Sequence, residues 1–517
     1  MQRFARSKAA RWAAFWLTAL LAAAFAGALA PASAHTQDAA HSPCIATVEQ
    51  RAAYAADGTL DEREAFQESL GNDEPSPGLV QQAIAREQAQ NGIAPNAVPG
   101  DDGGMAAIGN AHVVALRVSF PDRPFAEGDT LEALQALIGP RAVGEAALPS
   151  AGGFPYENLH DYYLRASYGA LTVTGEAFDY AAQHERDFYT ANIGQLYKEA
   201  LDHLEASGID LARFDANGDG RIDAVYLHFA GGDTGWGSVW WSNEQVLDVP
   251  DAVYADGTVR LWNAVALSNP CDQPWAAQTI IHETGHVLGL PDYYQYASQQ
   301  GGSTDRTGIL TFDIMMQNQG DHNGFSKWML GWLPDSKITR IFANETGIDV
   351  KRDGKVVQHV DATADGSSSV EAALEAFASN DIDETGGIVV VANQDASMFS
   401  SYYLLQYDRF AGNQSVRYEQ DGQPAELPSG FRLFRVQADL GSGGPYFVHS
   451  NTYGTVHNQL IELVDPDMNE PHAESTDLVP AASARANTAA CCTQATRCLP
   501  EVTLNQLFET PTSDSPA

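Results

Sequence analysis

The spacing of hydrophobic residues predicts a chain that mixes helices and strands. Residues 192–207 place apolar side chains three and four positions apart, as in a helix with one buried face. Residues 111–122 instead form a run of apolar and β-branched residues that Pro121 ends, which predicts a buried strand. By the same criteria, further helices are expected at 61–70, 78–90 and 156–168, and further strands at 170–178 and 224–229.

The pattern changes after residue 335. Short apolar runs at 388–392, 402–407 and 431–437 are separated by turn residues, which is typical of an all-β domain. We therefore predict an α+β chain, with a mixed domain at 111–335 and a β-rich domain at 336–470. The remainder, 471–517, is rich in Ala, Thr and Ser and is expected to be loosely ordered.

The N-terminus has the features of a signal peptide. Basic residues open the chain, an apolar run covers 12–30, and Ala32-Ser33-Ala34 offers a cleavage site, so 1–34 is expected to be removed during export. An uncleaved membrane anchor is the alternative. Residues 35–110 then form a pro-segment and linker, or a small helical domain without an inhibitory role. Beyond the leader, no stable membrane insertion is expected.

The candidate chemistry lies in residues 278–294. His282, Glu283 and His286 have the spacing H-E-x-x-H, and positions i and i+4 share one face of a helix. Both imidazoles can therefore reach one metal ion, while Glu283 is placed to take a proton from a water molecule on that ion.

The residues that follow predict a third ligand. Gly289 is suited to the left-handed turn that ends a helix, and Pro291 prevents the helix from resuming. This reversal would bring Asp292 back toward the histidines, and three protein ligands with an open position are typical of catalytic zinc. The spacing matches the metzincin pattern with Asp in the last ligand position, and Met315 is the candidate for the Met-turn.

Residues 282–293 resemble the zinc signature of the immune inhibitor A family of secreted bacterial metallopeptidases. Residues 313–332 resemble the segment that follows it there, and the resemblance covers 113–437 in patches. It implies a metzincin-like catalytic domain, a β-rich domain after it, and a zinc endopeptidase made as a precursor. By this resemblance His282, His286 and Asp292 bind zinc, Glu283 is the general base, and Met315 is the Met-turn residue.

Several assignments stay open at this stage. Some zincins take a Glu ligand from a later helix, which would leave Asp292 in a supporting position. Tyr293, Tyr294 and Tyr296 are candidates to line the cleft or to stabilise the oxyanion, and Asp321 and His322 to support the ligands. His228 lies in an apolar strand, where a hydrogen-bonded core histidine is the commoner outcome.

A second ion is predicted at residues 215–223. Oxygen-bearing groups recur there as in the first nine positions of a calcium loop, from Asp215, Asn217, Asp219, the Arg221 carbonyl and Asp223. The twelfth position is Tyr226 instead of Glu, and a strand follows in place of a helix. We therefore expect a structural calcium site, with an ion-free turn as the alternative.

Composition narrows the class of protein. The 517 residues carry a formal charge of −38, which argues against nucleic acid as a partner. Export permits disulfides among the five cysteines, and because the number is odd, at least one cysteine cannot pair within the chain. Cys44 in the predicted pro-segment is a candidate zinc ligand in a latent form, or a thiol without such a role.

The sequence thus predicts a secreted, monomeric zinc endopeptidase with a protein or peptide substrate, in which Glu283 moves a proton from water to the leaving amine. The alternative is a secreted binding or adhesion protein that keeps zinc and calcium as structural ions.

Overall fold

The computed structural model describes residues 46, 48–92, 103–140, 158–268, 276–296, 313–361, 386–420, 430–452 and 458–464, with short pieces at 16–17, 271, 309, 367–368, 423–426 and 479–480. Apart from 16–17 and 479–480, the predicted signal peptide and the tail at 471–517 lie outside the described residues, as does Cys44.

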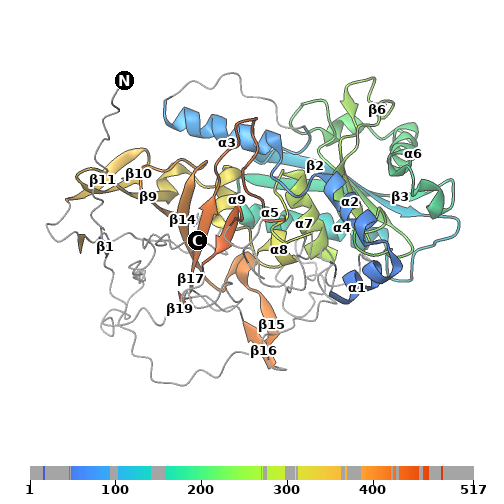
Figure 1. Ribbon diagram of the computed structural model, residues 1–517. Coiled ribbons are helices and arrows are strands. Elements are labelled where there is room, and N and C mark those ends of the chain that lie inside the picture. The colour runs from blue at the N-terminus through green and yellow to red at the C-terminus, as the bar shows by residue number, and fades with distance from the viewer. Residues whose placement is uncertain are drawn as a thin grey trace, which may run out of the picture.

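Helices and strands are interspersed along the chain, which confirms the mixed α and β class (Figure 1). The first sheet has five strands in the order β3 (Leu171–Ala181), β2 (Gly109–Ser119), β4 (Val225–Phe229), β8 (Asn263–Leu267) and β5 (Asn243–Val246). The first four strands are parallel, while β5 runs antiparallel to β8 at the edge. The predicted strands at 111–122, 170–178 and 224–229 are confirmed, with shifts of a few residues at their ends.

Both faces of this sheet are buried, as a nearly continuous apolar strand requires. Alternate residues of β2 enter two core clusters, Val113 and Ala115 on one face and Val114 and Leu116 on the other. The first face packs against α4 (Leu131–Ile138), α5 (Leu159–Ala166) and α7 (Ala276–Val287), and the second against α6 (Ile193–Ala206). The apolar positions that predicted α6 are all buried.

A second sheet follows residue 337. Its strand order is β11 (Lys355–Asp361), β10 (Gly347–Arg352), β9 (Ile338–Ala343), β13 (Ile388–Ala392), β14 (Ser401–Asp408), β17 (Gly430–Gln437) and β18 (Ile461–Leu463), and β19 (Val479–Pro480) also pairs with β17. The predicted strands at 388–392, 402–407 and 431–437 are confirmed. Shorter pairs join β1 (Trp16–Leu17) to β12 (Ser367–Ser368), β6 (Val253–Tyr254) to β7 (Val259–Arg260), and β15 (Arg417–Gln420) to β16 (Gln423–Glu426).

The two sheets share one core. A single buried cluster contains Ile280 of α7, Met315 of α8 (Ile314–Gln317), Phe325 of α9 (Gly324–Met329) and Leu404 of the second sheet. The backbone N–H of Gly324 also donates to the Gln406 side chain, at 2.8 Å. The predicted boundary at 335 therefore separates two sheets but not two hydrophobic cores.

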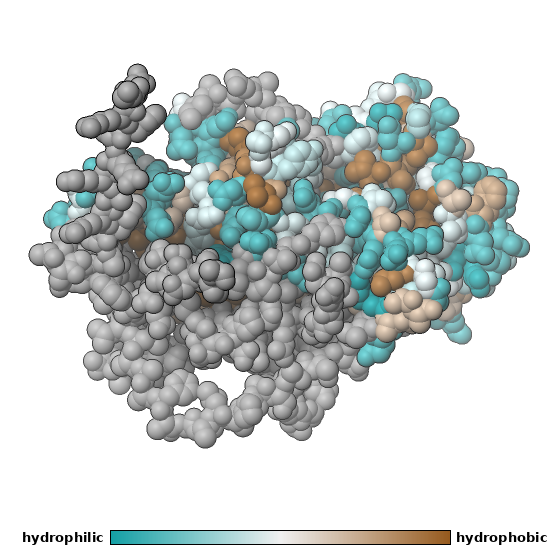
Figure 2. All heavy atoms as spheres, viewed as in Figure 1, coloured by the Kyte–Doolittle hydropathy of each residue, from teal (hydrophilic) through white to brown (hydrophobic). Residues whose placement is uncertain are grey.

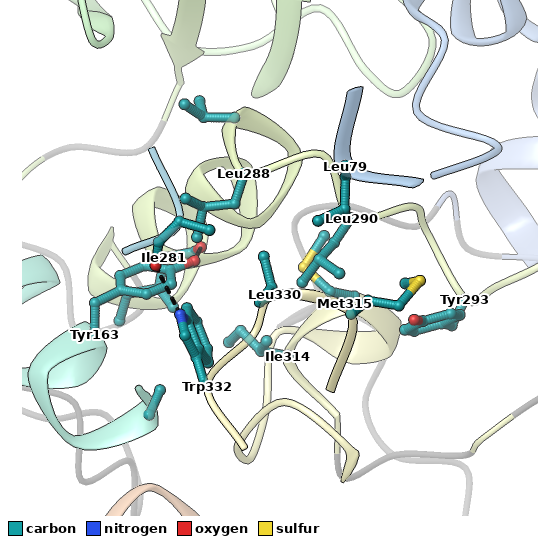
Figure 3. Close-up of a cluster of buried hydrophobic side chains, with 14 of the residues drawn as sticks. Leu79, Tyr163, Ile281, Leu288, Leu290, Tyr293, Ile314, Met315, Leu330 and Trp332 are labelled. Carbon is teal, nitrogen blue, oxygen red and sulfur yellow. Dashed lines mark hydrogen bonds between the residues drawn. The ribbon is translucent and has the colours of Figure 1, made fainter. Parts of the chain in front are cut away.

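Three helices precede the first sheet, namely α1 (Val48–Asp57), α2 (Leu60–Leu70) and α3 (Pro77–Gln90), of which the last two match predicted helices. Ser76 caps α3 by accepting from the Leu79 N–H, and proline follows at the first helical position. Leu79, Val80 and Ala83 are buried in the shared core, and Figure 3 shows Leu79 beside Leu290. This part of the chain is therefore built into the fold.

Hydrophilic residues predominate among the coloured residues in the space-filling view, and hydrophobic ones form small separate patches (Figure 2). Within the described ranges, each helix is too short or too polar to traverse a lipid bilayer.

Candidate metal centre

Helix α7 carries both candidate histidines and is buried along its whole length. The rings of His282 and His286 lie one turn apart, with centroids separated by 4.9 Å. The helix ends as predicted, because Gly289 adopts a φ of 87°. The N–H groups of Gly289 and Leu290 then donate to the carbonyls of His286 and Gly285, at 2.7 and 2.9 Å. This left-handed turn reverses the chain.

The reversal brings Asp292 to the two histidines. Its Oδ1 atom lies 3.1 Å from Nε2 of His282 and 3.4 Å from Nε2 of His286. The three residues are buried, and they form one of two groups in the described part of the chain whose donor atoms are close enough to hold one metal ion. Asp292 therefore lies where it could share one metal ion with both histidines, and no Glu from a later helix belongs to this group among the described residues.

Hydrogen bonds orient all three side chains. Nδ1 of His282 lies 2.7 Å from the Ile314 carbonyl, and Nδ1 of His286 lies 2.8 Å from the Leu290 carbonyl. Because a carbonyl only accepts, each Nδ1 carries a proton, and Nε2 is the nitrogen that could face a metal ion. The Tyr296 hydroxyl donates to Oδ2 of Asp292 at 2.6 Å.

The donor set fits a transition metal. Oδ1 of Asp292 is buried and has no hydrogen-bond partner in the described part of the chain. Such an atom is costly to bury unless a proton or a cation satisfies it. Two imidazole nitrogens and one carboxylate oxygen, each held from behind, are a ligand set of catalytic zinc.

The electrostatics of the centre are strongly coupled. Burial lowers the pKa of His286, but the Asp292 carboxylate outweighs burial and raises it to about 9. Burial also acts to raise the pKa of Asp292, whereas the charge of His286 and the close approach of both imidazoles hold it well below its usual value. The centre thus favours an ionised carboxylate beside positive charge.

Two buried glutamates lie near these ligands. Glu283 follows His282 on α7 and is 2% exposed, so little water reaches it in this conformation. Glu244 lies on the edge strand β5, where burial raises its pKa to about 8, the charge of His286 opposes this rise, and Glu283 adds to it. Sequence reasoning missed Glu244, since no motif surrounds it and only the pairing of β5 with β8 places it here.

Met315 packs against α7 between the two histidines. A Cβ atom on Gly285 would lie 2.2 Å from Sδ of Met315, so the side chain fits only because residue 285 is glycine. The Met315 carbonyl accepts from the Tyr293 N–H at 3.0 Å. Figure 3 shows Met315 close to Leu290 and near Tyr293. Met315 therefore lies against the helix that carries the two histidines.

Of the three candidate tyrosines, Tyr296 contacts a metal-ligand candidate through its hydroxyl. The Tyr293 hydroxyl instead pairs with Oγ of Ser326 at 2.7 Å. Tyr294 packs against Tyr296, with ring centroids 5.6 Å apart.

Asp321 and His322, which follow Met315 in the chain, have different surroundings. Asp321 accepts from Nζ of Lys327 at 2.6 Å, and this ion pair is buried. His322 packs among aromatic rings, 5.6 Å from the Trp332 ring, and its Cε1 lies 3.6 Å from where a Cβ on Gly285 would stand. His322 therefore lies behind α7, whereas the Asp321 carboxylate serves Lys327.

The predicted calcium loop is held by its own backbone. Asp215 accepts from the N–H groups of Gly218, Asp219 and Gly220, and Oδ1 of Asp219 from the Arg221 N–H. Asn217 bonds to the Gly104 carbonyl at 2.6 Å, and Asp223 accepts from the His112 N–H at 2.7 Å. The carboxylates of Asp215, Asp219 and Asp223 are not one of the two metal-sized groups among the described residues.

His228 belongs to the other group, with Asp129 and Cys271. Its Nε2 lies 2.7 Å from Oδ2 of Asp129 and its Nδ1 lies 3.3 Å from the Leu267 carbonyl. Both ring nitrogens therefore have partners, as expected for a core histidine.

Comparison with known proteins adds no family to this description, because no protein-family model and no curated protein matches the chain.

Proposed function

We propose that this chain is a secreted zinc-dependent metalloendopeptidase of the immune inhibitor A type, with a metzincin-like catalytic domain. One observation carries the proposal: Nε2 of His282, Nε2 of His286 and Oδ1 of Asp292 face one another, with Glu283 next to His282. A structural zinc site has no use for the neighbouring carboxylate and normally has a fourth protein ligand.

His282, His286 and Asp292 would hold the zinc ion. When bound, zinc would polarise the scissile carbonyl and make the attacking water more acidic. The carbonyls of Ile314 and Leu290 keep the imidazoles aimed at the ion, and Tyr296 fixes the carboxylate. Groups that hold the ligands in this way commonly raise metal affinity by one to two orders of magnitude.

We assign to Glu283 the proton transfers of peptide hydrolysis. Its carboxylate would accept a proton from the attacking water and deliver it to the nitrogen of the leaving amine. The edge strand β5 favours a peptide as the substrate, because the edge of a sheet can bind an extended chain through backbone hydrogen bonds. We include a structural calcium ion at 215–223 in the proposal as a separate element.

The test compares Glu283→Gln with Glu132→Gln, the same change at an exposed position on α4. Zinc and calcium are measured in the secreted protein, its N-terminus is sequenced, and casein hydrolysis is followed with and without o-phenanthroline. We expect about one zinc ion per protein molecule in the wild type and in both variants. The chelator should block casein hydrolysis, and of the two variants only Glu283→Gln should lose it. Zinc without hydrolysis in any form would support the binding-protein alternative, and full activity of Glu283→Gln would remove Glu283 from its role.

A further inference from the structure

The second metal-sized group, Asp129, His228 and Cys271, joins three separate parts of the first sheet and its connections. Asp129 lies just before α4, His228 lies near the end of β4, and Cys271 lies in the connection from β8 to α7. A carboxylate oxygen, a ring nitrogen and the Cys271 Sγ all lie within 4.8 Å of one another. The group therefore meets near the carboxyl ends of parallel strands, where α/β sheets commonly bind ligands.

The His228 ring lies between two groups that can only accept hydrogen bonds when Asp129 is ionised. Its Nε2 lies 2.7 Å from Oδ2 of Asp129, and its Nδ1 lies 3.3 Å from the Leu267 carbonyl. A neutral imidazole carries one N–H and can satisfy only one of these acceptors. The other contact requires a second proton or a cation.

The Asp129 carboxylate is also not fully satisfied by His228. Its Oδ1 atom is buried and has no hydrogen-bond partner in the part of the chain that the structure describes. Nε of Arg117 lies 4.0 Å from this atom, beyond hydrogen-bond distance, while Nη2 of Arg117 donates to the Asp129 backbone carbonyl. A buried carboxylate oxygen without a hydrogen bond is costly unless a nearby positive charge offsets it. The carboxylate therefore has capacity to bind a further cation.

The sulfur atom of Cys271 indicates the class of that cation. Thiolate sulfur, imidazole nitrogen and carboxylate oxygen together are ligands of zinc and related transition metals, whereas calcium and magnesium prefer oxygen alone. A Cys-His-Asp arrangement could also activate a nucleophilic thiol. However, Cys271 is 3% exposed and His228 is 1% exposed, so a substrate has no access to the sulfur. Burial thus favours a bound ion over nucleophilic catalysis.

The surroundings hold the His228 ring in place and connect it to α7. The Phe125 ring packs against it with centroids 5.1 Å apart. Tyr226, two residues earlier on β4, points to the same face of the sheet, and its hydroxyl pairs with Oγ1 of Thr284 on α7 at 2.7 Å. The group therefore lies on the face of the sheet that α7 covers.

We propose that Asp129, His228 and Cys271 form a second binding site for a transition-metal ion of the zinc class, separate from the centre formed by His282, His286 and Asp292. An ion there would tie the connection before α7 to β4 and so fix the start of the helix that carries the two histidines. Its occupancy would raise the zinc content from the one ion expected above to about two per molecule. The inference does not rest on the proposed function, because metal binding is measured without a substrate.

The test titrates metal-free full-length protein with Co²⁺ under argon, with calcium present to fill oxygen-rich sites. A bond from cobalt to thiolate absorbs in the near ultraviolet by charge transfer, which imidazole and carboxylate ligands do not provide. Three variants are compared with wild type. Cys271→Ser removes the proposed sulfur ligand, Cys44→Ser makes the same change at another cysteine, and His286→Asn removes a ligand of the other centre.

We expect about two Co²⁺ ions and the thiolate band in wild type and in Cys44→Ser. His286→Asn should lose one ion and keep the band, whereas Cys271→Ser should lose one ion together with the band. A wild type without the band would overturn the inference and leave His228 and Asp129 as an ion pair. A band that persists in Cys271→Ser, or that disappears in Cys44→Ser, would overturn it as well.

A measurement without a change at the site covers the case in which Cys271→Ser does not fold. X-ray absorption at the zinc edge is recorded on zinc-loaded Cys44→Ser. A sulfur neighbour at about 2.3 Å from zinc would support the second site. A shell of nitrogen and oxygen atoms alone would overturn it.

Discussion

Replacing Gly289 with alanine tests the turn on which the candidate centre depends. Gly289 has a φ of 87°, and a Cβ there would lie 2.4 Å from Oγ of Ser76 and 3.0 Å from Cβ of Leu79. The substitution therefore adds backbone strain and a steric overlap with the start of α3. Ser76 cannot rotate away freely, because its Oγ accepts from the Leu79 N–H as the cap of α3.

The structure offers a control that separates these two effects. Gly257 has a φ of 89°, and a Cβ there would have nothing within 4 Å. Gly257→Ala should therefore cost only the left-handed strain, about 1–2 kcal/mol. Gly289→Ala adds about 1–3 kcal/mol for the overlap, part of which is the cap at about 1 kcal/mol. We expect a total of about 2–5 kcal/mol for Gly289→Ala.

Urea unfolding followed by tryptophan fluorescence measures both variants. The difference between their unfolding free energies isolates the contact of residue 289 with Ser76 and Leu79. Exchange at 288–294 should also quicken in Gly289→Ala and remain unchanged in Gly257→Ala. Equal free energies for the two variants would refute the reasoning, because they would show that Ser76 and Leu79 do not pack on this turn.

Three further predictions concern side chains around the centre. Tyr296→Phe removes the hydrogen bond to Asp292, so we expect zinc affinity to fall about 10- to 100-fold in chelator competition; an unchanged affinity would show that Asp292 needs no such support. Lys327→Met leaves the buried Asp321 carboxylate uncompensated and should cost about 3–5 kcal/mol in urea unfolding. Lys327→Met/Asp321→Asn should recover most of this loss, and an equal loss in both would contradict the pairing. Burial raises the pKa of Asp313 to about 6, against hydrogen bonds that lower it. Since this exceeds the value of an unfolded Asp, about 4, its contribution to stability is full below pH 4 and is lost as the pH rises through 6. In chelator-treated protein, the difference in unfolding free energy between wild type and Asp313→Asn should therefore fall between pH 4 and 7. A difference that stays constant over this range would contradict a raised pKa at Asp313.

The sequence alone determined the features that depend on neighbours along the chain. The 3.6-residue period of α6 predicted which of its faces is buried, and the apolar run at 388–392 coincides with β13 residue for residue. The same holds for α7, whose two histidines share a face and whose last turn needs the positive φ of glycine. These are short-range properties, since period, capping and backbone strain are set within a few residues.

Only the tertiary structure decided what lies around the centre. Residues 243–246 show no strand pattern, yet they form the sheet edge and place Glu244 near His286. The Asn72 side chain meets that strand across a separation of 172 positions in the chain. Such pairings depend on the free energy of packing segments that are distant in sequence, which no local pattern expresses. The sequence therefore identified the ligand candidates, and the packing of distant segments determined which groups orient those ligands and which cover them.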